Sequence, residues 1–210
     1  MLFTPEGLTR AVVWDRGEPR LLPKFPDERD GDAVFSIHSR GYIVGQSAAK
    51  PAMWYRNQVT PLGTMGGTWG LAMSVNSRGD SVGLAATPED ASIHGVLWSQ
   101  GKAIDLTPDS TFGFANSINE RGQIVGGIGD ANFEGQAALW ENGQAILLNA
   151  VIPANSGWNL IEADCINQKG QIAGFGTLHG EIRAFLLTPI RNQECDDRPG
   201  RRSGEDHDRD

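Results

Sequence analysis

The segment Ile118–Gly126, INERGQIVG, contains the pattern that organises this chain. Ile118 is expected to end one strand and Gln123–Gly126 to form the next, because β-branched residues favour pleated strands. Between them lies Asn-Glu-Arg-Gly. The Asn side chain can accept a hydrogen bond from the backbone two residues on, and Gly adopts the left-handed conformation that ends such a turn. The segment therefore predicts a β-hairpin with a tight turn.

This hairpin is repeated along the chain. Further copies of the nine-residue pattern occupy residues 37–45, 75–83 and 166–174. The closing glycines Gly45, Gly83, Gly126 and Gly174 are 38, 43 and 48 residues apart. A period of this length indicates one supersecondary unit per repeat, with about four short strands if the unit is all β.

A second element, an apolar run ending in tryptophan, accompanies each hairpin. It occurs at residues 11–14, 52–54, 95–98 and 137–140, and with leucine in place of tryptophan at 184–187. Near-continuous apolar runs indicate strands buried on both faces. Because tryptophan buries a large area, the four residues of this element are expected to pack between neighbouring sheets; they are Trp14, Trp54, Trp98 and Trp140.

Together the two elements predict an all-β protein, a β-propeller-like array of four-stranded antiparallel blades in about four repeats. The repeat domain is expected to span residues 1–190, with repeats near 11–49, 50–93, 94–135 and 136–182 and a final strand at 183–189. Residues 191–210, rich in charge and without aliphatic branches or aromatics, are expected to form a disordered tail.

The strand count does not give whole blades, because the tryptophan-type strand has five copies and the hairpin four. Either the ring is incomplete and the chain is a fragment of a longer protein, or a compact four-blade ring carries a redundant strand. We expect the incomplete ring. Its unpaired apolar flank would favour self-association. Cys165, which takes the strand position of Ser74 and Ser117, is expected to be a buried small residue, and a disulfide with Cys195 stays open.

Strand parity places the tight turns on one end of every sheet, here called the turn face, and the longer loops on the opposite end, the loop face. Function is expected on the loop face, because variable loops on a rigid scaffold carry most binding sites. Its aromatic and acidic residues suit a sugar, a peptide or a cation. The candidate ligand-binding residues are Trp69, Trp158, Phe112, Phe133, Asp130 and Glu134. Trp158 has an alternative role as a cap on the core.

Composition excludes several other classes of function. A net charge of −8 without a basic stripe argues against nucleic acid as a partner, and no apolar run approaches the roughly 20 residues of a membrane helix. The acidic stretch Asp27–Asp32 lacks the alternating spacing of a calcium loop, so no metal is expected. No nucleotide or catalytic motif occurs, and no cofactor is expected. A pairing of His94 with Glu89 or Asp90 is the weakest of the catalytic options.

Four pieces of this sequence together resemble the extracellular HAF repeat family of bacteria. They are His94-Gly95-Val96-Leu97-Trp98, Asp105-Leu106, the loop Leu62–Gly67 and the segment Ala115–Gly126. The resemblance covers about residues 8–189. It implies a repeat protein of mostly unknown function that is exported, although the segment MLFTPEGLTR does not have the pattern of a signal peptide, so a cytoplasmic location stays open.

The leading functional hypothesis is a non-enzymatic binding module whose loop face takes a carbohydrate or a protein at the cell surface. The first alternative is a propeller-type lyase or glycosidase in which loop carboxylates such as Asp130 and Glu134 perform acid–base catalysis. The second is a purely structural repeat or a fragment of a longer protein. Fold analogy does not choose among these classes.

Overall fold

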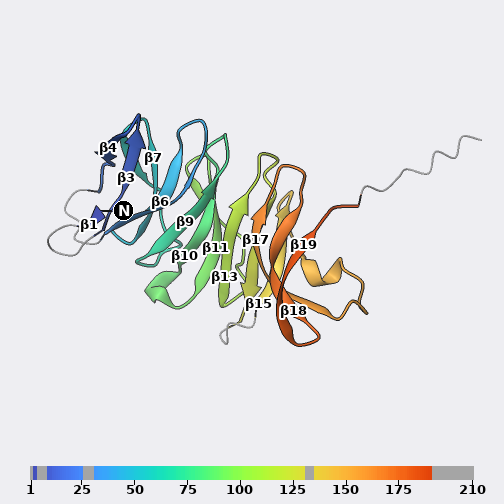
Figure 1. Ribbon diagram of the computed structural model, residues 1–210. Helices are drawn as coiled ribbons and strands as arrows, with labels where there is room; N and C mark the ends of the chain where they lie inside the picture. Colours follow the sequence, from blue (N-terminus) through green and yellow to red (C-terminus); the bar gives the residue numbers. More distant parts are fainter. Residues whose placement is uncertain (1, 4–8, 26–30, 131–134, 191–210) are drawn as a thin grey trace, which may run out of the picture.

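The computed structural model describes residues 2–3, 9–25, 31–130 and 135–190 (Figure 1). The prediction of an all-β protein with antiparallel sheets is confirmed. The only helical segments in this part of the chain are the 3₁₀ turns η1 (Pro88–Asp90) and η2 (Leu148–Ala150). No helix among the described residues is long and apolar enough to cross a membrane.

The strands form a series of antiparallel meanders that follow one another in chain order (Figure 1). The first are β1 (Leu2–Phe3) with β2 (Thr9–Arg10), and β3 (Val12–Asp15) with β4 (Glu18–Leu21). A four-stranded sheet contains β5 (Asp32–Ile37), β6 (Ile43–Ser47), β7 (Lys50–Tyr55) and β8 (Gln58–Pro61).

The next two meanders have the same order of strands. One contains β9 (Gly70–Val75), β10 (Ser81–Ala86), β11 (Ile93–Ser99) and β12 (Lys102–Asp105), and the other β13 (Phe112–Ile118), β14 (Ile124–Gly129), β15 (Gly135–Glu141) and β16 (Gln144–Leu147). A single parallel bridge between Ile93 and Phe112 joins them. The last sheet contains β17 (Trp158–Ile166), β18 (Ile172–Leu178) and β19 (Glu181–Leu187).

Each sheet begins with the strand that precedes the Asn-x-x-Gly turn. The first strands β5, β9, β13 and β17 contact one another in succession, so they form the inner row of the stack. The tryptophan-type strand is third in each sheet. Hydrogen bonds from a backbone N–H to a serine hydroxyl link successive first strands. Ile118 N donates to Ser74 Oγ and Ile166 N donates to Ser117 Oγ, each at 3.3 Å.

The predicted hairpin turn is confirmed in its atomic detail. Asn119 Oδ1 accepts hydrogen bonds from Arg121 N at 3.0 Å and from Gln123 N at 3.1 Å. Gly122, at the fourth turn position, has φ of +82°. The same geometry recurs at the other copies, where His38 Nδ1 takes the place of the Asn oxygen in the first. A local side-chain acceptor and a glycine are therefore enough to define each turn.

The closing glycines are required by β-bulges in the first strands. In each hairpin the pairing skips a residue of the first strand, as it skips Asn116 between Ala115 and Ser117, and in β17 it skips two. The bulge brings a first-strand carbonyl against the glycine. A Cβ on Gly45, Gly83, Gly126 or Gly174 would lie 1.9–2.0 Å from that oxygen. No side chain fits at these positions, which explains the repeated glycine.

The tryptophans clasp each sheet to the one before it. The indole nitrogens of Trp54, Trp98 and Trp140 donate to the carbonyl oxygens of Pro23, Gly63 and Leu106, at 2.6, 3.0 and 3.0 Å. Each acceptor lies just after the last strand of the preceding sheet, which is β4, β8 or β12. All three tryptophans are buried, as predicted. For Trp14 the prediction is wrong, because its side chain is 67% exposed.

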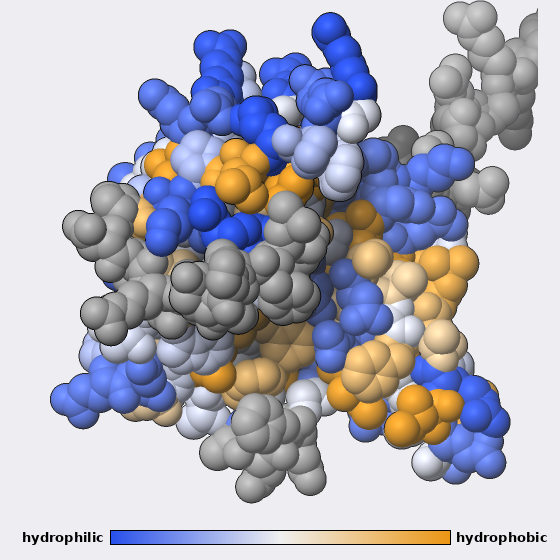
Figure 2. Space-filling model, turned by 60° about the vertical axis from the view of Figure 1, so that its left-hand side comes forward, coloured by the Kyte–Doolittle hydropathy of each residue, from blue (hydrophilic) through white to orange (hydrophobic). Residues whose placement is uncertain are grey.

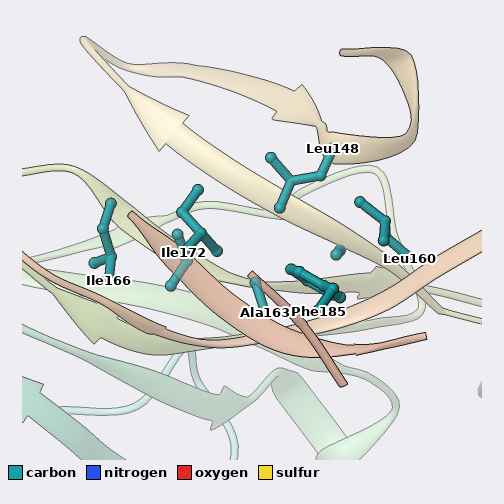
Figure 3. Close-up of a cluster of buried hydrophobic side chains, with 8 residues drawn as sticks. Leu148, Leu160, Ala163, Ile166, Ile172 and Phe185 are labelled. Carbon is teal, nitrogen blue, oxygen red and sulfur yellow. The ribbon is translucent and has the colours of Figure 1, made fainter. Parts of the chain in front are cut away.

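One apolar cluster fills each junction between consecutive sheets, so the core is divided into four parts. The second and third junctions combine small or branched residues of the first strand, such as Ala115 and Ile118, with the tryptophan of the third strand. The cluster of the first junction has Trp54 but no residue of β5. In the last junction Leu148, Leu160 and Phe185 pack together (Figure 3). In β19 the position of the tryptophan is held by Leu187, so leucine and phenylalanine side chains fill this junction.

The described sheets do not close into a ring. The pair β3–β4 and the sheet β17–β19 lie at opposite ends of the stack (Figure 1). Cys165 is exposed, so its predicted burial is wrong. The serines at its position lie under a following first strand, whereas no described sheet follows β17–β19. Cys195 and the tail at 191–210 lie outside the described residues.

Gly126→Ala should reduce the free energy of unfolding by about 2–3 kcal/mol, because the new methyl group meets the Phe114 carbonyl oxygen across a rigid hairpin. Urea unfolding followed by tryptophan fluorescence measures the loss. Gly135→Ala is the matched control, since its Cβ would meet nothing closer than 3.6 Å, and it should change stability by less than about 0.5 kcal/mol. Equal effects of the two substitutions would contradict the bulge argument.

Trp98→Phe should destabilise the protein by about 2 kcal/mol, because it removes the hydrogen bond to Gly63 O and part of a buried ring. Trp14→Phe should have little effect on the same denaturation curve, since Trp14 is exposed. A loss of similar size in both variants would show that the clasp is not what stabilises the junction.

Candidate functional site

The turn face is occupied by a hydrogen-bonded network that joins the repeats to one another. The Glu120 carboxylate accepts from Ser77 N at 3.1 Å and pairs with His38 Nε2 at 3.0 Å, so one side chain touches the turns of two other sheets. Its backbone N–H donates to Gln168 Oε1 at 3.0 Å. Hydrogen bonding from the Ser77 hydroxyl lowers the pKa of Glu120, and the backbone of Ser77 and the charge of His38 act in the same direction. This face is built to hold the sheets together.

The loop face is less uniform than strand parity alone predicts. The connections expected as variable loops at Gln46–Pro51 and Phe175–Arg183 are two-residue hairpin turns, at Ala48-Ala49 and His179-Gly180. Longer connections remain between β8 and β9, β10 and β11, β12 and β13, and β16 and β17. Binding surface is therefore concentrated where these longer loops lie together.

A hollow of about 270 Å³ opens on the loop face between the sheets β9–β12 and β13–β16. Its lining combines an aromatic ring, two carboxylates and two hydroxyls. The residues are Asp90, Ala91, Ser92, Ile93, Thr111, Phe112 and Asp130. Two of the candidate residues proposed from sequence, Phe112 and Asp130, are therefore brought together.

Asp90 fastens the neighbouring loop to the edge of this hollow. Its Oδ1 accepts from Thr68 N at 2.8 Å and its Oδ2 accepts from Thr68 Oγ1 at 2.6 Å. The hydroxyl bond, followed by the backbone bond, lowers the pKa of the Asp90 carboxyl. Thr68 immediately precedes the half-buried Trp69, so this pair of bonds restrains the backbone next to Trp69.

Trp69 and Phe112 occupy the same register position in consecutive sheets. Ala86 N donates to Trp69 O at 3.0 Å, and Phe112 pairs with Gly129 at the corresponding end of the next hairpin. Phe112 also contacts Phe114, with ring centroids 5.5 Å apart. The sequence alone does not show that these two candidate residues share a register position.

Trp158 belongs to the core at the end of the stack. Its ring meets Phe185 edge-on, with centroids 6.4 Å apart, and it packs against the apolar cluster of the last junction. The role of core cap, which the sequence left open, therefore describes it better than that of a ligand contact. Trp158 is far along the chain from the hollow and does not line it.

Other candidate residues fall elsewhere. Phe133 and Glu134 lie outside the described residues, as do Asp27 and Asp30. Asp32 is buried and is held by Arg10 Nε at 3.1 Å and by Ser47 Oγ at 2.6 Å, which leaves it no part in a calcium loop.

His94 lies under the surface and pairs with Asp105, its Nδ1 lying 2.7 Å from Oδ2. The catalytic pairing of His94 with Glu89 or Asp90 and its alternative as a surface histidine are therefore both wrong. Within the described ranges, no group of three or more His, Cys, Asp or Glu side chains could hold a metal ion.

From the sequence, Asp90 is expected only as a catalytic partner of His94, and Ser92 and Thr111 belong to no expected site. No local motif marks these residues, because Ser92 and Thr111 come together only when β11 and β13 form their parallel bridge. A spacing rule within one repeat cannot find contacts that depend on how two repeats stack.

Comparison with known proteins supplies no assignment. No protein-family model matches the chain, and no curated protein matches it significantly.

Glu162, on β17, is a half-buried carboxyl outside the hollow. Asn116 Nδ2 donates to its Oε1 at 2.9 Å from the preceding first strand. Burial raises the pKa of Glu162 above the ordinary 4.5, the hydrogen bond from Asn116 opposes this, and the neighbouring Asp164 carboxyl adds to the rise. The folded protein therefore binds a proton here more tightly than the unfolded chain does.

Glu162→Gln should stabilise the protein at pH 7 and leave its stability unchanged at pH 3. A carboxyl with a raised pKa favours folding only while it is protonated, so its contribution is lost as pH rises from about 4.5 through the native pKa. Glutamine keeps the acceptor for Asn116 and carries no charge. Urea midpoints at the two pH values test this, and a gain at pH 3 as large as that at pH 7 would rule out ionisation as the cause.

Proposed function

We propose that this protein is a non-enzymatic binding module whose loop face takes a carbohydrate in the hollow between the sheets β9–β12 and β13–β16. The observation that carries the proposal is the meeting of Phe112 with Asp90, Asp130 and two hydroxyl residues in one concave site. Binding sites typically combine an apolar surface with a few placed polar groups.

The chemistry of this hollow matches the two surfaces of a sugar. The C–H face of a pyranose ring packs against an aromatic side chain, and its hydroxyls donate to carboxylates and exchange hydrogen bonds with Ser and Thr hydroxyls. Phe112 supplies the aromatic surface, Asp130 a carboxylate, and Ser92 and Thr111 the hydroxyls. Trp69, held by the Thr68–Asp90 pair, extends the aromatic surface at the edge. A flat protein partner would need less concavity than this site offers.

For the fold we propose an open arc of a β-propeller, in which each four-stranded meander is a blade. The repeated first-strand contacts and the repeated tryptophan clasp support this reading. We also propose membership of the HAF repeat family, on the sequence pieces that resemble it, and with it a location outside the cell or in the cell envelope. The family's repeat explains the architecture and leaves the ligand open.

A glycosidase or lyase is the weaker candidate. A glycosidase needs one carboxylic acid with a raised pKa to protonate the leaving group. In the described hollow, Asp90 has a lowered pKa and both its oxygens already accept hydrogen bonds. Glu134, the other acid proposed for catalysis with Asp130, lies outside the described residues. A purely structural repeat predicts no ligand for the hollow, which separates it from the binding hypothesis.

Phe112→Ala and Asp130→Asn should each reduce retention on a glycan array at least tenfold, because one removes the stacking surface and the other the carboxylate. Asp15→Asn, an exposed acid on the turn face, is the control and should leave retention unchanged. Circular dichroism confirms that each variant keeps its β-sheet signal. Absence of any retained glycan with the unmodified protein, or retention that survives both loop-face substitutions, would sink the carbohydrate proposal.

A further inference from the structure

Three junctions of the stack are sealed by one valine from the second strand of a sheet. Val44, Val82 and Val125 are fully buried, each in the cluster that it forms with the first strand of the following sheet. Val82, for example, lies in one cluster with Ala115 and Ile118 of β13. The second strand thus covers the inner half of every complete junction.

The first junction lacks this cover. Ile37 of β5 is 66% exposed, whereas its counterpart Ile118 is 7% exposed, and Val34 is likewise exposed where Ala115 is buried. The strand β5 therefore offers an apolar surface to which nothing is packed in the described structure. Figure 2, which brings the N-terminal end of the stack forward, shows hydrophobic side chains at the surface among hydrophilic ones.

Strand β1 marks the line along which a covering strand would lie. Strand β1 pairs with β2 through Leu2↔Arg10 and Phe3↔Thr9. Strand β10 pairs with the matching part of β11 through Ala85↔His94 and Ala86↔Ile93. Arg10 and His94 both stand four residues before their tryptophan. In the described structure a strand therefore lies beside β2, namely β1, but none lies at the corresponding edge of β3.

The edge of β3 at that place has unpaired backbone groups. Leu22 N donates to Ala11 O on the side of β4, at 2.9 Å, so the alternation of an antiparallel ladder turns the N–H and C=O of Val12 and Trp14 to the other side. Within the described residues, β3 pairs with β4 alone. An open strand edge of this kind is a template for another strand.

Edge and apolar surface together form a groove of about 250 Å³. Its lining is apolar except for one serine. The residues are Val12, Val13, Trp14, Leu22, Val34, Phe35, Ser36, Ile37 and Ile43. A polar small molecule finds few partners here, while an extended chain can pair its backbone with β3 and place alternate side chains against β5.

We propose that this groove binds an extended segment of another protein, which adds to β3 as an antiparallel strand. The segment contains a valine at its centre, as in Ile-Val-Gly. The valine of the segment occupies the position that Val82 takes between β9–β12 and β13–β16, where it packs against the first strand of the following sheet. This groove is separate from the loop-face hollow, so the proposal does not depend on whether that hollow binds a sugar.

A second copy of this chain is a poorer occupant. Its strands of the required type, β6, β10, β14 and β18, are each already paired on both edges. To donate one, the copy would have to open a formed sheet. A segment that is extended and unpaired before binding has no such cost beyond its own ordering.

The test uses the full chain and a fluorescein-labelled peptide with the sequence of residues 119–126, NERGQIVG, which ends before the place that β1 occupies. We expect saturable binding by fluorescence anisotropy, at least tenfold weaker for the peptide in which the residue matching Val125 is Asp. Ile37→Glu in the protein should weaken binding at least tenfold. Ile182→Glu is the matched control, since Ile182 is 72% exposed on β19 at the other end of the stack, and should bind as the unmodified chain does.

Hydrogen exchange identifies the binding mode, because strand addition protects the amides of Val12 and Trp14 in the presence of the peptide. No binding at millimolar peptide, equal binding of the Asp peptide, or equal loss with Ile37→Glu and Ile182→Glu would overturn the proposal. So would a dimer of the free chain, seen by light scattering, that Ile37→Glu converts to a monomer, because the groove would then belong to a second copy.

Discussion

The structure depends on a clasp between consecutive sheets, in which a tryptophan on the third strand of one sheet donates its indole N–H to a carbonyl just beyond the last strand of the sheet before. A twisted antiparallel sheet of four strands with short strands at its outer side cannot bury enough surface alone. The tryptophan fills the space between two such sheets, and its hydrogen bond fixes their distance and angle. In the three junctions after β5–β8, β9–β12 and β13–β16, a valine of the second strand and residues of the next first strand complete the inner half.

Much of this architecture follows from short-range patterns in the sequence. Asn119 and Gly122 define their turn by contacts within five residues, so the hairpin was predictable from the pattern alone. The glycine at 126 was recognised as a marker of the repeat, but its cause, a carbonyl pushed toward it by the bulge at Asn116, requires the pairing of two strands. Cys165 and Trp14 were misjudged for one reason: each is like its buried counterparts in sequence, but stands at an end of the stack where no described sheet covers it.

The hollow on the loop face was predictable only in part. Composition pointed to Phe112 and Asp130, because aromatic and acidic residues in connections of unequal length stand out against a regular repeat. The part played by Asp90 follows from its bonds to Thr68, in the loop that precedes β9, 22 residues earlier in the chain. Sites that form between repeats are set by stacking distances, and these are determined by the tryptophans and glycines of the junctions, so the ligand surface is a consequence of the same residues that hold the fold.

The division of the core into four separate clusters has a consequence for folding. Because each sheet contacts chiefly its neighbours, stability approximates a sum of sheet terms and junction terms, as in a one-dimensional chain of coupled units. Units at the ends have one neighbour instead of two. The two-stranded β3–β4 unit, joined to the rest by one junction, is then the first to open in thermal fluctuations, and the interior sheets β9–β16 are the last. The end units therefore unfold locally more readily than the interior sheets. The weakest junction between two sheets limits the cooperativity of unfolding of the whole stack.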